Sequence, residues 1–431
     1  MIYLLIFGCL GLLIFSYFIF HGSISNPSFI IILGFLLSSV NLLQNQSIWQ
    51  FNDEKTVFIV LGGLLSFEIA SGLVFSAYKK RRIIGEFDIQ FFNLNLKLIL
   101  YLTIQILTYI AIIIIICKME GQSINSIHGI SVALSSYHQE EINGNVSLPS
   151  WINWIYILLL SGNYLIIYFF DYLVIKKNKI SIILKLNIIL ILLGSLVTGN
   201  KTNIIMYLLA LAIDYIILQQ KYLKKLNTLN IKKILIAIVI IFLSFNVFKF
   251  ITTIQGRTVN GMDPFYNFST YLGAPLKNFE IFITKQDTVN IGLFGSQTFK
   301  NSYEWLTELT GNAINIPNLY TYNWINGLGL GNVYSIYQQL YNDFGIIGSI
   351  FFMFLLGSFS TFIYCFALFK NNKSGVSFWL IYYSYLANAL FLSYFSNKIG
   401  ESIFARASIY FLIGLFIFYY FFVKVNNTSK H

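Results

Sequence analysis

The feature that most constrains this chain is a series of long apolar segments that recurs along most of its length. A membrane-spanning helix needs roughly 20 predominantly apolar residues. Windows of that kind occur at about eleven places: 2–20, 28–45, 57–77, 98–117, 153–175, 180–198, 203–220, 234–253, 345–369, 376–394 and 403–423. The apolar residues are continuous and do not alternate, which favours helices over the strands of a membrane barrel. The sequence therefore predicts an all-α polytopic membrane protein with about eleven transmembrane helices.

Composition agrees with a membrane location. Only 10% of the residues are charged and 57% are hydrophobic, whereas a soluble globular protein carries about 25% charge. The first apolar segment lacks a basic stretch before it and a small-residue cleavage site after it, so we expect a retained helix. Cys9, Cys117 and Cys365 lie in or beside apolar segments at spacings that suggest neither a metal site nor a disulfide. The sequence predicts no metal and no cofactor.

The basic residues predict how the segments are oriented. Clusters of Lys and Arg fall between alternate apolar segments, at 79–82, 176–179, 221–233, 370–373 and 424–430. The positive-inside rule places all of these in the cytoplasm, which puts the N-terminus outside and the C-terminus inside. About twelve of the 17 acidic residues then fall on the opposite face. The net charge of +11 is explained by this topology, and we expect no nucleic-acid partner.

One long interruption divides the apolar series. It separates an N-terminal bundle of about eight spans (1–253) from three C-terminal helices (345–431), with a large extracytoplasmic loop at 254–344 between them. We expect amphipathic helices in this loop at 264–286, where Asp263 precedes Pro264 as an N-cap, and at 296–310. Because most of the chain resembles an anchor, the loop is where chemistry is expected.

Aromatic residues of the loop are candidates for contact with sugars. Trp305, Trp324 and Tyr334 carry flat apolar rings that can stack on sugar faces. Aromatic residues also gather at membrane interfaces, which is the alternative explanation for them. Both interpretations place these residues at the outer face.

Several cations near the outer face are candidates for binding an anion. Lys201 follows a Gly-Asn turn that leads into a helix, whose N-terminal N–H groups favour negative charge. The sequence Gly-Asn-Lys-Thr at 199–202 resembles the end of a P-loop, although the upstream glycine of that motif is missing. The alternative is a tight helical hairpin in which Lys201 reaches the interface.

Two arginines strengthen the expectation of an anion site. Arg257 lies a few residues beyond the eighth apolar segment, with Lys249 about one turn below that segment's outer end, and Arg406 lies near the outer end of the eleventh. Guanidinium groups match phosphate oxygens in two-point contacts, so Arg257 and Arg406 are candidate ligands of a diphosphate at headgroup depth. Alternatively, Arg406 pairs structurally with Glu401 or Glu68.

Candidate acids and bases are fewer. Glu68 lies mid-span, where an ionised carboxylate is costly, so it is neutral, paired or lining a polar cavity. His128 lies with His138 and two glutamates in the 118–152 loop, a set that suits a base but matches no metal motif. Asp343 closes the large loop, where it either caps the ninth helix or serves as a base or sugar ligand.

These pieces, taken in order, resemble a known family. The strings "TGNKTNIIMYLLAL" (198–211), "YLGAPLKNFEIF" (271–282), "FGSQTF" (294–299) and "NVYSIYQQLYNDFGIIG" (332–348) are similar to those of oligosaccharide repeat-unit polymerases, the O-antigen polymerases of the Wzy type. The resemblance covers the middle and later parts of the chain and implies a GT-C-like architecture. The first 150 residues match only as generic hydrophobic segments.

The resemblance implies an inverting glycosyltransferase of the bacterial plasma membrane that polymerises undecaprenyl-diphosphate-linked repeat units into O-antigen or capsular polysaccharide and releases the lipid diphosphate. Arg257, Arg406 and Lys201 are then the expected diphosphate ligands, with Lys249 nearby. Asp343, Glu280 or His128 would accept the proton of the attacking hydroxyl. Arg257 lacks the glycine that some members carry at the position corresponding to Phe268. A chain-length regulator and membrane lipids are the further partners implied.

Other functions compete with this interpretation. A lipid-linked oligosaccharide flippase or other transporter is favoured by Glu68, but no internal repeat is visible. An O-antigen ligase shares the expected architecture. A membrane O-acyltransferase would require a well-placed histidine, and only loop histidines are present.

Overall fold

The computed structural model describes residues 1–78, 81, 83, 89, 94–142, 146–197, 202–227, 264–285, 288, 292–311, 314–370 and 376–423. Within that part of the chain, seven helices are long and apolar enough to cross a membrane: α1 (Ile2–Ile19), α2 (Pro27–Gln44), α4 (Glu54–Tyr78), α5 (Leu94–Met119), α7 (Ser150–Ile175), α9 (Thr202–Leu223) and α14 (Ile336–Phe369). Shorter helices also coincide with predicted segments: α8 (Ile182–Gly194), α15 (Phe378–Phe391) and α16 (Arg406–Phe422). The chain is a membrane-embedded, all-α protein. The predicted segment 234–253 lies outside the described residues.

Helix α14 differs most from its predicted boundaries. It begins at Ile336 with Ser335 at the N-cap, well before the expected start at 345. Asp343 therefore lies inside the helix, and the prediction that it caps the start of this helix is wrong. Gly345 interrupts the helix with φ 66° and ψ −164°, a backbone conformation that is essentially restricted to glycine. The kink separates a polar first part of α14 from its apolar remainder.

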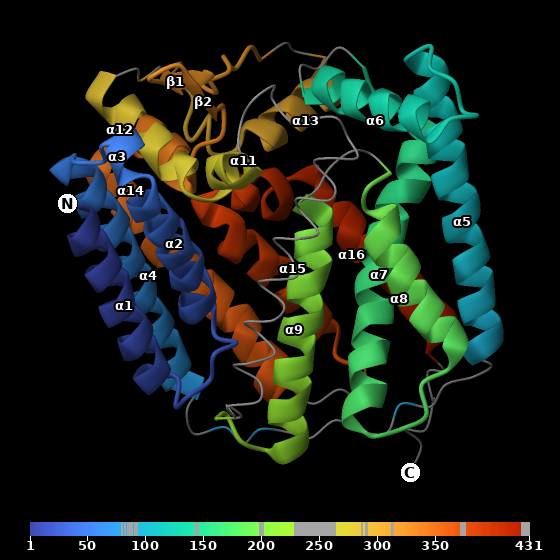
Figure 1. Cartoon of the computed structure of the whole chain (residues 1–431). Helices are drawn as coiled ribbons and strands as arrows, with labels where there is room; N and C mark the ends of the chain where they lie inside the picture. The colour runs from blue at the N-terminus through green and yellow to red at the C-terminus, as the bar shows by residue number, and fades with distance from the viewer. Residues whose placement is uncertain are drawn as a thin grey trace.

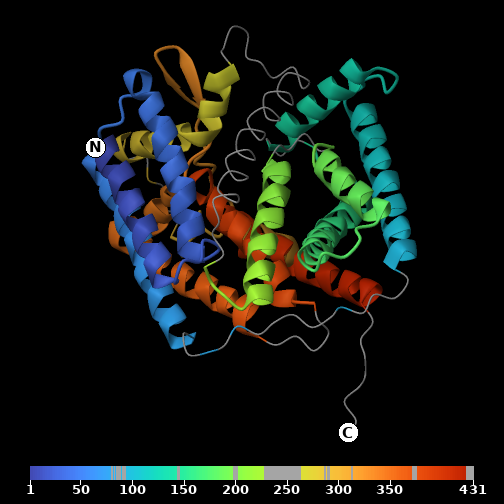
Figure 2. The same ribbon diagram turned by 60° about the horizontal axis from the view of Figure 1, so that its bottom comes forward.

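The two ends of the helix bundle differ in what they carry (Figure 1). One end, here called the polar end, carries the short helices α3 (Gln46–Trp49), α6 (Ile127–Ile142), α11 (Pro264–Leu272), α12 (Ala274–Lys285) and α13 (Lys300–Thr310), and the hairpin of β1 (Asn323–Ile325) and β2 (Leu328–Gly331). The other, here called the basic end, carries the connections that hold the described members of the predicted basic clusters (Figure 2). The described members of these clusters thus lie at one end, as their alternate spacing predicts, and the cluster at 424–430 lies outside the described residues.

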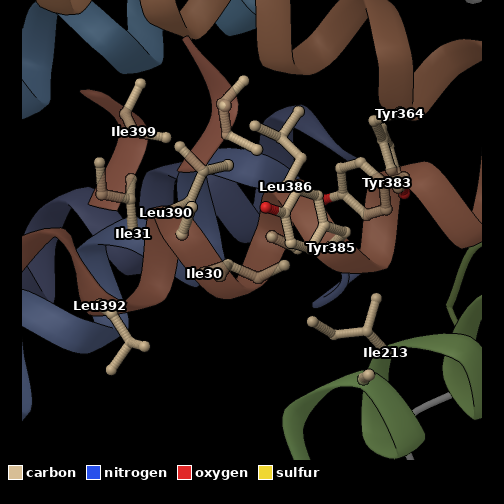
Figure 3. Packing of buried hydrophobic residues seen from close by; sticks show 14 of the residues in the cluster. Ile30, Ile31, Ile213, Tyr364, Tyr383, Tyr385, Leu386, Leu390, Leu392 and Ile399 are labelled. Atoms are coloured by element: carbon tan, nitrogen blue, oxygen red, sulfur yellow. The ribbon is translucent and has the colours of Figure 1, made fainter. Parts of the chain in front are cut away.

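Close helix contacts form the centre of the bundle. Helices α4 and α14 touch where Gly357 lies against the backbone of Phe67, since a Cβ added at Gly357 would lie 2.3 Å from the Phe67 carbonyl oxygen. Small residues at such crossings allow two helices to approach closely, which is how packing energy arises in lipid. Helix α2 packs against α15, where Leu386 and Leu390 of α15 lie beside Ile30 and Ile31 of α2 (Figure 3).

A buried polar network joins a second group of helices. Asn163 of α7 accepts hydrogen bonds from the Tyr101 hydroxyl (2.7 Å) and the Gln105 amide (2.6 Å) of α5, and donates to the Tyr207 hydroxyl of α9 (2.9 Å). All four side chains are buried. Interhelical hydrogen bonds of this kind fix which faces of neighbouring helices meet inside a membrane.

Candidate functional site at the polar end

The polar end begins with two helices that lie on α2. The single helix predicted over 264–286 is two helices, α11 and α12, which meet at Gly273. A Cβ at Gly273 would lie 2.6 Å from the Asn41 Oδ1 of α2 and 2.9 Å from the Leu42 nitrogen, so only glycine allows this approach. Asp263, the predicted N-cap, lies outside the described residues. The first part of the interrupted region is therefore seated directly on the membrane helices.

Glu280 of α12 fixes this region to the start of α4. Its Oε1 accepts backbone N–H bonds from Asn52 and Asp53, both at 2.7 Å, and its Oε2 forms an ion pair with Lys277. The Lys277 ammonium also donates to the Gln50 carbonyl at 3.2 Å. Glu280 is only 4% exposed. Both of its oxygens are engaged, so its position suits a structural anchor better than the predicted base.

Side-chain amides hold the irregular segment 314–335. Asn278 of α12 donates to the Val333 carbonyl (2.8 Å), and Asn323 donates to the Asn278 Oδ1 (3.0 Å) and to the Tyr334 hydroxyl (2.8 Å). The Tyr334 hydroxyl in turn donates to the Thr321 carbonyl at 3.0 Å. Tyr334 is only 2% exposed. Its ring lies in the interior, where it does not present a face for a sugar.

The two predicted tryptophans lie on different elements. Trp324 of β1 is 60% exposed and lies next to the exposed Tyr322, with ring centroids 5.0 Å apart. Trp305 lies on α13 and is half-buried, while Leu306 and Leu309 on the same helix are exposed. The Tyr322–Trp324 pair is thus an exposed aromatic surface at the polar end, with the two rings tilted by 43° to each other.

Asp343 joins α14 to the turn that precedes α13. Its Oδ2 accepts the backbone N–H groups of Gln297 (3.0 Å) and Thr298 (2.6 Å). The Thr298 carbonyl then accepts a bond from the Asn397 amide at 3.0 Å, and the Asn397 Oδ1 accepts the Gly400 N–H at 2.9 Å. Gly400 belongs to η2 (Ile399–Ile403), a single π-helical turn. Asp343 therefore holds together three segments that are far apart in the sequence.

Arg406 lies at the edge of this assembly as the first residue of α16. It forms an ion pair with Glu308 of α13, and its guanidinium lies 5.8 Å from the Tyr410 ring centroid. Its carboxylate partner is therefore neither Glu401 nor Glu68, the two predicted alternatives. Glu401 pairs with Lys398 instead. Since the Arg406 side chain is 40% exposed, its charge is open to solvent.

Lys55, in the first turn of α4, is a cation that was not among the predicted site residues. Its ammonium donates to the Tyr341 hydroxyl of α14 at 2.7 Å. It forms no ion pair with a carboxylate in the described part of the chain. Its position in the short polar connection directly before the apolar segment 57–77 is the sequence signal that could have identified it. Lys55 therefore adds a cation where the start of α4 meets α14.

A further polar group surrounds Tyr320. Its hydroxyl accepts the Gln339 amide. Burial raises the pKa of Tyr320, and the negative charge of Glu401 raises that pKa further, so the hydroxyl remains protonated and able to donate. Thr298 Oγ1 and Gln339 Oε1 are also buried and have no hydrogen-bond partner among the described residues. The Thr298 hydroxyl and the Gln339 amide oxygen therefore remain available for hydrogen bonds close to Asp343 and η2.

The remaining predicted residues are not brought to this place. His128 is exposed on α6, which packs on α5 on the opposite side of the molecule from α12 and the hairpin (Figures 1 and 2). Lys201, Lys249 and Arg257 lie outside the described residues. Among the residues that are described, no group of three metal-ligating side chains gathers.

The polar end thus combines an anchored cap, an exposed aromatic pair, a carboxylate that positions a turn, and solvent-accessible cations at the ends of membrane helices. Such a set can bind an anion at the membrane edge and hold a polar chain above it. No family model, curated protein or solved structure matches the chain.

Proposed function

We propose that this protein polymerises undecaprenyl-diphosphate-linked oligosaccharide repeat units at the outer face of a bacterial plasma membrane. The observation that carries the proposal is the junction of α13, η2 and α16. There Arg406 pairs with Glu308 of α13, and Lys398 follows Asn397, which bonds the turn held by Asp343. Lipid diphosphates place their charge at headgroup depth, the level at which membrane helices such as α16 begin. The resemblance to repeat-unit polymerases supports the same activity.

In the proposed reaction, a sugar hydroxyl of one repeat unit attacks the anomeric carbon of the growing chain. A new glycosidic C–O bond forms, the bond from the anomeric carbon to the diphosphate oxygen breaks, and undecaprenyl diphosphate leaves with inversion at that carbon. Cations stabilise the charge that develops on the leaving diphosphate, an effect worth several kcal/mol in enzymes. We assign this role to Arg406, together with the predicted Arg257 and Lys201, and Lys249 is a further candidate.

The hydroxyl proton goes to a carboxylate in this scheme, and Asp343 is the proposed acceptor. Both Asp343 oxygens accept hydrogen bonds, but the residue is only half-buried and forms no ion pair within the described residues, whereas Glu280 is buried and paired with Lys277, and His128 lies on α6. The exposed Trp324 and Tyr322 rings are the proposed sugar-stacking surface, and Trp305 on α13 is a further candidate. No cofactor is required, since the lipid diphosphate is itself the activated donor.

A transporter is the second candidate, favoured by Glu68. This side chain of α4 is fully buried, and both of its carboxylate oxygens lack a hydrogen-bond partner within the described residues. Buried acids in membrane helices often belong to substrate or proton pathways. An O-antigen ligase, which would use the same donor but a different acceptor, is the third.

Reconstituted protein distinguishes these functions. Lipid-linked repeat units are isolated from cells that lack the protein and are added to vesicles that contain it. A ladder of elongated products with stoichiometric release of undecaprenyl diphosphate is expected, and Arg257→Ala should abolish the ladder while the protein still inserts and folds. Movement across the bilayer without elongation would show a flippase, and transfer only to a lipid A core would show a ligase.

A further inference from the structure

The basic end contains a pocket of about 420 Å³ that the proposed polymerase reaction does not use. Four segments distant in sequence contribute to it: the turn after α1, the end of α4 with the residues that follow it, the residues after α9, and the end of α14. Its lining residues are His21, Phe75, Arg81, Ile83, Lys224, Lys225, Leu226, Asn227 and Phe369. The volume is within the range of small-molecule sites in proteins.

The lining of this pocket combines cations with an aromatic floor. Phe75 and Phe369 are buried, with ring centroids 6.4 Å apart, and Phe75 also packs against Phe20 at 4.6 Å. Arg81, Lys224 and Lys225 are exposed. None of the lining residues is acidic, and none of the three cations forms an ion pair within the described part of the chain. Within the described residues, the pocket therefore presents positive charge without a counter-ion.

Basic residues at this end have another explanation, because α1, α4, α9 and α14 all end here and cations stabilise helix C-termini. Lys221 shows that arrangement: it is 1% exposed and donates to the Ala367 carbonyl near the end of α14. Lys224 and Lys225 differ from it. Their side chains form no hydrogen bond with a carbonyl of the described residues, so their charges remain available to a ligand.

The walls of the pocket are fixed by buried hydrogen bonds. Gln220 of α9 donates to the Ser23 hydroxyl at 2.8 Å, and Ser23 bonds the Tyr364 hydroxyl of α14 at 2.6 Å. His21 and Lys224 adopt left-handed backbone conformations, with φ of 51° and 53°. A left-handed residue is a common way to end a helix, and here the Lys225 N–H donates to the Gln220 carbonyl at 3.1 Å. The backbone that carries Lys224 and Lys225 is therefore held at the end of α9.

We propose that this pocket binds a phosphate group, with the phosphate at Arg81, Lys224 and Lys225 and the apolar part of the ligand over Phe75 and Phe369. Arginine and lysine are the residues that recognise phosphate, by two-point and single-point contacts respectively. The phosphate belongs either to an anionic lipid headgroup of the adjacent leaflet or to a soluble phosphate compound. The site lies at the end of the bundle opposite to the proposed polymerase site and does not depend on that function.

The test uses the full-length protein in nanodiscs of phosphatidylcholine alone. In one arm phosphatidylglycerol is titrated into the disc, and in the other pyrophosphate is added in solution; binding is followed by native mass spectrometry and calorimetry respectively. The variants are Lys224→Gln with Lys225→Gln, and a matched control, Lys177→Gln with Lys179→Gln. The control removes the same charge from exposed residues of the same end that do not line the pocket.

Saturable binding is expected in at least one arm, and the responding arm identifies the source of the phosphate. Each lysine near a membrane surface contributes about fivefold to the binding of an anion, so the pocket double variant should bind about twenty-fivefold more weakly. The control double variant should differ by less than about threefold if the pocket, rather than the whole basic end, binds the phosphate. Absence of saturable binding in both arms, or an equal loss in the two double variants, would overturn the proposal.

Discussion

Replacement of Glu280 tests whether the polar end is anchored as the structure indicates. In Glu280→Gln, the amide oxygen can still accept the N–H groups of Asn52 and Asp53, which lie 2.7 Å from Oε1. The amide nitrogen, however, then faces the Lys277 ammonium, whose side chain is only 10% exposed. Removing one partner of a buried ion pair costs about 3–5 kcal/mol, because the remaining charge is left buried. Since Lys277 keeps the Gln50 carbonyl, we expect the lower value, about 3 kcal/mol.

A surface pair at the same end provides the control. Lys300 and Glu304 are 4.0 Å apart, with side chains 23% and 55% exposed. Such pairs contribute about 0–1 kcal/mol, so Glu304→Gln should change little. The free energy of unfolding is measured by SDS titration in mixed micelles for both variants and for Glu280→Gln combined with Lys277→Met. The double variant should be more stable than Glu280→Gln alone. If Glu280→Gln and Glu304→Gln gave the same stability within about 1 kcal/mol, the anchoring role assigned to Glu280 would be refuted.

Two further predictions address the proposed site and the kink. Arg406→Ala should reduce elongation by about a hundredfold or more, because a cation that stabilises the leaving diphosphate is lost. The stability should change little, since an exposed ion pair contributes at most about 1 kcal/mol. Glu308→Ala breaks the same ion pair and should leave elongation largely intact. Equal losses of elongation in both variants would show that the ion pair, and not a diphosphate contact, is what Arg406 supplies. Gly345→Ala should destabilise the protein by about 1–3 kcal/mol or more in SDS titration, since alanine is strained at φ 66°, ψ −164°. Gly11→Ala, in a helical position where a Cβ meets nothing within 4 Å, should not lower the stability. A neutral Gly345→Ala would mean that the kink is not imposed by the fold.

Much of the membrane architecture could be read from the sequence because its causes are local. Hydrocarbon excludes unpaired backbone groups over a fixed thickness, so each apolar stretch of sufficient length predicts a helix by itself. The alternation of basic clusters likewise predicts which connections share an end, and those of them that are described do so. The helix boundaries were less predictable where polar residues extend a helix beyond its apolar part. In α14 the polar first part begins at Ile336, and tertiary contacts, not hydropathy, decide that start.

The partners of the charged residues could not be predicted, because they depend on long-range packing. Glu280 bonds a backbone group 228 residues away, Asp343 one that is 45 residues away, and Arg406 pairs across 98 residues. No spacing rule selects such partners; they are set by which helix ends meet. For the same reason Lys55 was missed, since its significance arises only when α14 brings Tyr341 against the start of α4.

The sequence by itself determined that the chain is a helical membrane protein and that its basic connections share one end, because length, hydropathy and charge act on each segment independently. Only the tertiary structure decided that Glu280 is an anchor, that Asp343 holds a turn instead of capping its helix, and that three of the basic residues line one pocket. These outcomes depend on side chains brought together from separate helices. Packing and the requirement to satisfy buried polar groups select that arrangement, and neither is visible in a local pattern.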